Sequence, residues 1–284
     1  MKHKHIKEIH TFGTSFTAGG GHSFDIPDEI LKKDEALRIR VESLNKVYSE
    51  KPKTMFNYSW PGQLQRLVKK GIKVFNHAKE GFGNERMYRI TNDILWDGNN
   101  FVDCDDKIFL YEFSSLGRKE IWSNTVKDYC ILNYGEMTKR KNGKRWVNIQ
   151  QQYRVNTPDN HLEKYDRAWK TLSNFSRLYL EECVDEKAQI KKLQVNNHMF
   201  LDSLLYNEVN FYSVGVEPEY PLDKIKDKFV DFQGYSDFVD WGLKHRELIL
   251  GPLIGVKDNH FNLKGNKMIA NIIFNKLKEE GFYV

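Results

Sequence analysis

The side chains best suited to covalent chemistry stand at opposite ends of the 284-residue chain. Ser15 lies in a glycine-rich stretch, residues 12–21, and Asp258 and His260 stand close together near the other end. A serine hydroxyl is a weak nucleophile that needs a neighbouring base, and a histidine oriented by a carboxylate is such a base. These residue types predict acyl transfer, in which Ser15 attacks, His260 moves the proton and Asp258 fixes the imidazole tautomer.

The elements around these residues would bring them to one edge of a sheet. Residues 6–11 alternate apolar and polar side chains, which predicts a first strand ending just before Ser15. The glycines that follow allow a sharp turn and the close approach of a ligand. Open α/β sheets bind their ligands at such strand ends. Asp258 and His260 come just before a predicted amphipathic helix, whose apolar face consists of Met268, Ile269, Ile272, Ile273 and Leu277.

The rest of the chain alternates predicted strands and helices. Further strands are predicted at residues 72–76, 107–113 and 209–214, and helices at about 60–70, 85–95, 159–206 and 237–245. This alternation predicts an α/β fold with a parallel sheet and helices on both faces. We expect one domain over residues 1–284, with insertions near 25–58 and 135–156. The second insertion is predicted as a β-hairpin with a basic tip at residues 139–145.

Two sequence blocks resemble those of the SGNH (GDSL-type) hydrolases. The first block of that family runs Gly-Asp-Ser-x-Thr-x-Gly and is matched by Gly13, Ser15, Thr17 and Gly19, while Asp258 and His260 resemble the last block. The resemblance implies a three-layer α/β/α flavodoxin-like fold and a serine esterase that needs no cofactor. The family also includes lipases, thioesterases and acyltransferases, and a carbohydrate O-acetyl group is one ester that such an enzyme would hydrolyse.

The resemblance also implies where the oxyanion donors lie. The second family block is an Asn-x-x-x-x-Gly strand end whose glycine amide donates to the oxyanion, and Gly81 stands at that position, with Gly83 as the alternative. Together with the amide of Ser15, Gly81 would stabilise the tetrahedral intermediate. An ordinary strand-to-helix turn is the other interpretation of this stretch.

The third block differs most from the family. Its usual Gly-x-Asn-Asp is replaced by a stretch in which Ser114 falls at the position of the oxyanion asparagine, followed by Ser115 and Arg118. This version resembles the block of phage-encoded relatives. We assign Ser114, Ser115 and Arg118 to oxyanion or substrate binding, although Arg118 and Glu120 could instead brace the loop as a local ion pair.

Two smaller departures concern the end blocks. Thr14 replaces the aspartate of the first block, and Asp258 stands two residues before His260 where most of the family has a spacing of three. The shorter spacing requires a different loop turn. Thr17 stands where the Gly-x-Ser-x-Gly elbow of the α/β-hydrolases needs glycine, so that fold is less favoured.

Composition excludes several other classes of protein. A net charge of +5 is mild for this length and does not indicate nucleic-acid binding, and the basic tip at 139–145 is more typical of a solvated loop. Three cysteines without paired spacing argue against a disulfide framework or a zinc cluster.

The longest apolar run, about nine residues, is far short of the roughly 18 of a membrane-spanning helix. Since the basic N-terminus leads into no apolar signal core, we expect a soluble, cytoplasmic protein with no membrane partner, encoded by a phage if the third block is a guide.

The histidines offer metal binding as a competing chemistry. His3, His5 and His10 lie in or next to a basic N-terminal tail that we expect to fray. His22 and His77 flank the predicted site and could bind substrate or a metal, or could be polar loop residues. No motif of hydrolytic zinc sites is present in the sequence, so we expect no metal.

A non-catalytic role is the second hypothesis. The altered third block favours an inactive SGNH scaffold that serves as a binding or virion-associated protein, whereas Ser15 and His260 favour an active esterase.

Overall fold

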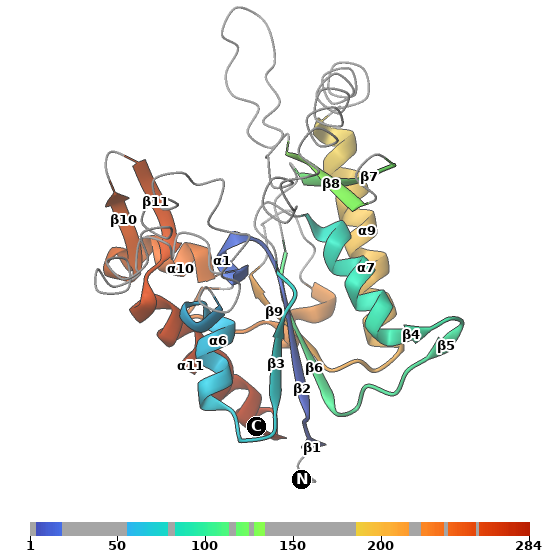
Figure 1. Cartoon of the computed structure of the whole chain (residues 1–284), viewed down its shortest axis with the longest axis horizontal. Coiled ribbons are helices and arrows are strands. Elements are labelled where there is room, and N and C mark those ends of the chain that lie inside the picture. The colour runs from blue at the N-terminus through green and yellow to red at the C-terminus, as the bar shows by residue number, and fades with distance from the viewer. Residues whose placement is uncertain are drawn as a thin grey trace, which may run out of the picture.

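Four parallel strands form the sheet that carries the candidate site (Figure 1). They are β2 (Glu8–Phe12), β3 (Lys73–Asn76), β6 (Lys107–Glu112) and β9 (Phe211–Gly215), in the order β3-β2-β6-β9. The computed structural model describes residues 4–18, 56–78, 83–113, 118–124, 128–133, 186–215, 223–235, 238–253 and 256–284. The strands agree with those predicted from hydrophobic patterning, and the near-continuous burial of β2, β6 and β9 is typical of parallel strands covered on both faces.

The strand order determines where a ligand would bind. From β2 the chain first adds β3 on one side and later adds β6 and β9 on the other. The order therefore reverses between β2 and β6, and in open sheets the crevice at the carboxyl ends of such a pair is the usual ligand site. Ser15 follows β2 directly, so it stands at this point.

Helices cover both faces of the sheet. α6 (Trp60–Leu67) and α11 (Leu263–Glu279) pack on one face, and α7 (Asn84–Leu95) and α9 (Glu186–Tyr206) on the other. The alternation of each strand divides the core into two clusters. The first joins Ile9, Ile108 and Leu110 to Trp60, Leu64, Ile269 and Ile273, and the second joins Phe12, Phe109 and Tyr111 to Met87, Leu95, Leu201 and Leu204.

Side-chain caps set the starts of two of these helices. Ser59 caps α6 by accepting a hydrogen bond from the Gly62 amide at 3.5 Å, and Pro61 occupies the first turn. Asn262 caps α11 by accepting from the Gly265 amide at 2.9 Å. The second cap fixes the point at which the chain leaves the strand that carries His260.

Two hairpins flank the sheet, and one of them changes a prediction. β7 (Arg118–Ser123) pairs with β8 (Asp128–Asn133), and β10 (Ile249–Leu253) pairs with β11 (Val256–Phe261), both antiparallel. Asp258 and His260 therefore lie in a strand, and the expected loop turn between them is wrong. The predicted hairpin at 135–156 and residues 25–55 of the other predicted insertion lie outside the described residues.

The remaining described elements are short. They are β1 (Lys4–His5), α1 (Ser15–Ala18), β4 (Trp96–Asp97), β5 (Asn100–Phe101), η3 (Asp223–Lys228), α10 (Phe238–Lys244), η4 (Arg246–Leu248) and β12 (Phe282–Tyr283). β1 pairs with β12, so the two ends of the described chain lie side by side (Figure 1). Within the described ranges, no helix has the length and apolar character needed to cross a membrane.

Candidate functional site

Ser15 begins the short helix α1 immediately beyond the carboxyl end of β2. Gly13 and Thr14 link β2 to α1, and the Ala18 amide donates to the Thr14 carbonyl at 2.9 Å to close the single helical turn. Residues 13–18 are called the Ser15 turn. Ser15 is 7% exposed and Thr17 is fully buried. The serine is thus held at the rim of the sheet on a backbone that has little freedom to move.

Glu112 fastens this turn to the neighbouring strand. It is the last residue of β6 and is buried, and its carboxylate accepts hydrogen bonds from the Thr14 amide at 3.1 Å, the Thr17 amide at 3.0 Å and the Thr14 hydroxyl. A Cβ atom at position 13 would lie 2.7 Å from Glu112 Cβ, so only glycine permits this approach. Burial raises the pKa of the Glu112 carboxyl, and the threonine donors oppose that rise.

A second set of contacts ties α1 to β3 and α6. Asn76 Nδ2 donates to the Thr17 carbonyl at 2.9 Å, while Asn76 Oδ1 accepts from the Thr11 hydroxyl and from the Ala78 amide. Trp60 Nε1 donates to the Thr17 hydroxyl at 3.1 Å. The Ser15 turn is therefore anchored to both of the strands that flank β2 and to a helix on one face.

His260 approaches this turn from β11. Its ring centroid lies 4.8 Å from that of Phe16, the residue after Ser15. Ile249 pairs with Phe261 and Gly251 with Asp258, so a step of two residues in β10 opposes a step of three in β11, and a β-bulge lies next to His260. Bulges of this kind redirect side chains near functional sites. Within the described residues no hydrogen bond joins Ser15 to His260, and the contact between their elements runs through Phe16.

The other predicted site residues are only partly described. Asp258 lies on β11 opposite Gly251, and Arg118 lies on β7 opposite Asn133, but their side chains are outside the described part. Gly81, Ser114 and Ser115 also fall outside it. The alternative glycine, Gly83, is buried and immediately precedes α7.

Glu120 of β7 is held by residues of helix α7. Arg89 of α7 forms an ion pair with it, with 3.2 Å between Arg89 Nη2 and Glu120 Oε2. The Glu120 amide donates to Glu85 Oε2 at 2.6 Å. Glu120 therefore connects β7 to α7, while the predicted pair with Arg118 stays a prediction because the Arg118 side chain lies outside the described part.

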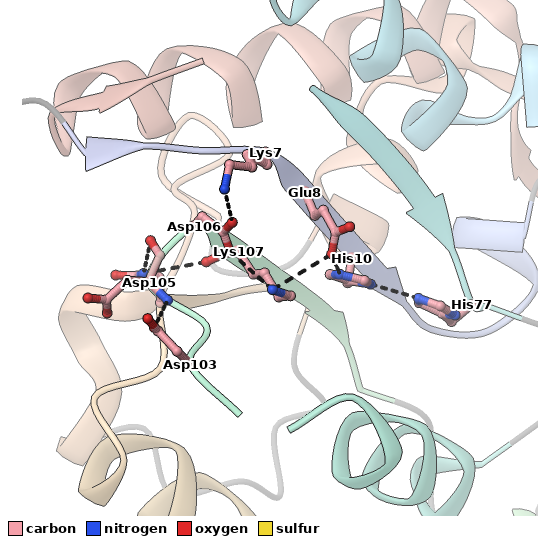
Figure 2. A network of polar contacts seen from close by, with 9 residues as sticks. Lys7, Glu8, His10, His77, Asp103, Asp105, Asp106 and Lys107 are labelled. Carbon is pink, nitrogen blue, oxygen red and sulfur yellow. Dashed lines mark hydrogen bonds and ion pairs between the residues drawn. The ribbon is translucent and has the colours of Figure 1, made fainter. Parts of the chain in front are cut away.

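A chain of three polar side chains runs along one face of the sheet toward the same edge (Figure 2). Glu8 Oε2 lies 3.1 Å from His10 Nε2, and His10 Nδ1 lies 2.9 Å from His77 Nε2. His10 is 5% exposed and lies in β2, within the stretch that the sequence predicts as the first strand. Burial lowers the pKa of His77 to about 4, with help from His10 and Arg86, and burial also lowers the pKa of His10.

Sequence reasoning missed the role of Glu112 and of this chain. Glu112 ends an apolar strand, and a carboxylate at that position is the one signal that could have identified it. Glu8 and His10 stand two apart in a predicted strand, a spacing that places both on one face. Among the described residues, no group of three or more His, Cys, Asp or Glu side chains could hold a metal ion.

Comparisons with protein-family models, curated proteins and solved structures found nothing that matches this chain.

Proposed function

We propose that this protein is a serine esterase of the SGNH type, built on a three-layer α/β/α flavodoxin-like sheet. Ser15 is the nucleophile, His260 the general base and Asp258 the residue that orients it. The main support is the Ser15 turn, which a buried Glu112 fastens at the reversal of strand order and against which the His260 ring packs through Phe16. Esterases require this kind of rigid serine beside an imidazole.

The proposed reaction follows from these groups. His260 takes the proton of the Ser15 hydroxyl as its oxygen attacks the ester carbonyl, and returns that proton to the leaving alcohol. Water then repeats the sequence on the acyl-enzyme and releases the acid. The Ser15 amide and the Gly81 amide, with the hydroxyl of Ser114 as a third donor, stabilise the oxyanion. Losing one such donor typically costs about 2.7–4 kcal/mol of barrier.

Glu112 takes over a structural task that the first block of the family gives to aspartate. Thr14 occupies the position of that aspartate, and the Glu112 carboxylate receives the amides of Thr14 and Thr17. A carboxylate from the neighbouring strand can therefore hold the loop although the local one is missing. This supports an active site despite the departure in sequence.

Hydrolysis of p-nitrophenyl acetate tests the proposal. We expect turnover by the wild-type chain and a loss of at least a thousandfold in Ser15→Ala and in His260→Ala, because the two residues act as one unit. Ser203→Ala, an exposed serine on α9, is the matched control and should retain full activity. Circular dichroism checks that each variant is folded.

The opposite result would favour the second hypothesis. If folded wild type and Ser15→Ala hydrolyse the ester equally slowly, the chain is not a serine esterase, and an inactive binding or virion-associated scaffold becomes the better account.

A further inference from the structure

The hydrogen-bonded side chains of Glu8, His10 and His77 fix which nitrogen of each imidazole carries the proton. A carboxylate can only accept, so His10 donates from Nε2 to Glu8 across 3.1 Å. A neutral imidazole has one N–H, which leaves His10 Nδ1 as the acceptor for His77 Nε2 at 2.9 Å. His77 therefore keeps an unprotonated Nδ1, which is not the nitrogen that faces His10 (Figure 2).

The surroundings hold both imidazoles neutral and in place. The His10 ring is stacked on Phe75 and Phe109, with centroid distances of 5.1 and 5.2 Å, and a charged ring there would lose its hydration. Lys107 Nζ lies 4.0 Å from Glu8 Oε2, so an ammonium group faces the Glu8 carboxylate. The lowered pKa of His77 agrees with a neutral ring near pH 7.

His77 stands beside the Ser15 turn. Its amide donates to the Thr11 carbonyl at 2.8 Å, one residue beyond the paired end of β3, and its ring stacks on Phe12 at 4.9 Å. Phe12 directly precedes the turn that carries Ser15. In the described part of the chain, no donor bonds to His77 Nδ1.

The neighbouring charge limits what could bind there. Arg86 Nε donates to the His77 carbonyl at 3.3 Å, and its positive charge helps to lower the pKa of the His77 ring. A cationic donor such as an ammonium would be repelled by it, whereas a neutral hydroxyl would not. A neutral donor therefore suits this uncharged acceptor, and in the alcohol part of an ester that donor is a hydroxyl group.

We propose that His77 Nδ1 accepts a hydrogen bond from a free hydroxyl on the alcohol part of the substrate, and that Glu8 and His10 are positioning residues that hold His77 in this tautomer. The inference rests on the proposed esterase function and narrows its substrate to esters of polyhydroxylated alcohols, of which partly acetylated sugars are an example.

Nitrogen NMR of the histidine side chains tests the tautomer without any activity. In the wild type at pH 7 we expect His77 to carry its proton on Nε2 alone. His10→Phe keeps an aromatic ring between Phe75 and Phe109 but removes both nitrogens, so His77 should become a mixture of tautomers. A wild-type His77 protonated on Nδ1 would overturn the proposal.

Kinetics on two esters test the subsite. One ester is a monoacetylated glucose with free hydroxyls, and the other is p-nitrophenyl acetate, which has none. We expect the ratio of their kcat/KM values to fall about tenfold in His77→Phe and severalfold in His10→Phe, which is the usual effect of one lost or misoriented hydrogen bond. Ser203→Ala should leave the ratio unchanged. A purely structural role would lower both values together, and an unchanged ratio in His77→Phe would overturn the proposal.

Failure of the esterase proposal gives a different result. If neither ester is hydrolysed, the monoacetylated glucose is titrated against the His77 nitrogen signals. A saturable shift that is absent in His10→Phe would support the hydroxyl subsite without catalysis, and no shift would reject it.

Discussion

The Ser15 turn takes its shape from a carboxylate that lies 98 residues further along the chain. Glu112 accepts hydrogen bonds from the amides of Thr14 and Thr17, and Gly13 leaves room for its side chain. Sequence could identify Ser15 because serine and glycine sit together in one short block. It could not identify the contact with Glu112, because that contact exists only once β2 and β6 pair.

Removing the Glu112 carboxylate should destabilise the folded protein. Glu112→Ala should lower the free energy of unfolding by about 3 kcal/mol, because it leaves the buried amides of Thr14 and Thr17 without an acceptor. Glu112→Gln has the same shape and one oxygen that can accept, so its loss should be clearly smaller. Urea unfolding of the two variants measures the difference. Equal stabilities for Glu112→Ala and the wild type would show that Glu112 does not hold the turn.

At the scale of elements, patterning predicted the parallel strands and most of the helices but missed the β10–β11 hairpin. The strands of the sheet and the start of α6 carry strong local signals, namely apolar runs and a Ser-x-Pro cap. β10 contains Gly251 and Pro252, which interrupt the apolar run and disfavour a strand. A two-stranded hairpin tolerates proline because, among the described strands, one edge of each of its strands has no partner. The sequence does not show which strands have an unpaired edge, so it predicts a loop where the structure has the strand that carries His260.

The Asn262 cap at the junction of β11 and α11 should contribute to the stability of the protein. Asn262 accepts from the Gly265 amide and donates to the Glu247 carbonyl at 2.9 Å, so it joins the cap of α11 to η4. Asn262→Ala should cost about 1 kcal/mol of stability, and Asn262→Asp, which keeps the cap acceptor, should cost less. Thermal unfolding compares the two. If Asn262→Asp is as unstable as Asn262→Ala, the cap is not the stabilising contact.

For the whole molecule, the buried histidine chain couples stability to pH. The pKa of His77 is about 4 in the folded protein, against an ordinary value near 6.5. Between these values the unfolded chain binds a proton at this site that the folded protein does not bind. Stability should therefore fall as the pH drops from about 6.5 toward 4. The groups that face this pair are Glu8 and Lys107, with Arg86 next to His77.

Comparing the wild type with His77→Phe isolates this contribution. The wild type should lose more stability on acidification than the variant, by up to about 1.4 kcal/mol per pH unit inside that window. Carboxylates titrate in both proteins and cancel in the difference. Urea unfolding at several pH values between 4 and 7 provides the measurement. Parallel curves for the two proteins would mean that His77 titrates normally in the fold.

Covalent labelling shows whether Ser15 is an activated nucleophile. A fluorophosphonate reacts with a serine only when a neighbouring base activates it, so it reports on the nucleophile and its base without knowledge of the true ester. If Ser15 and His260 act together, we expect one adduct per chain, located on Ser15 by peptide mass spectrometry and lost in His260→Ala. A folded protein that stays unlabelled, or that is labelled at another serine, would contradict it.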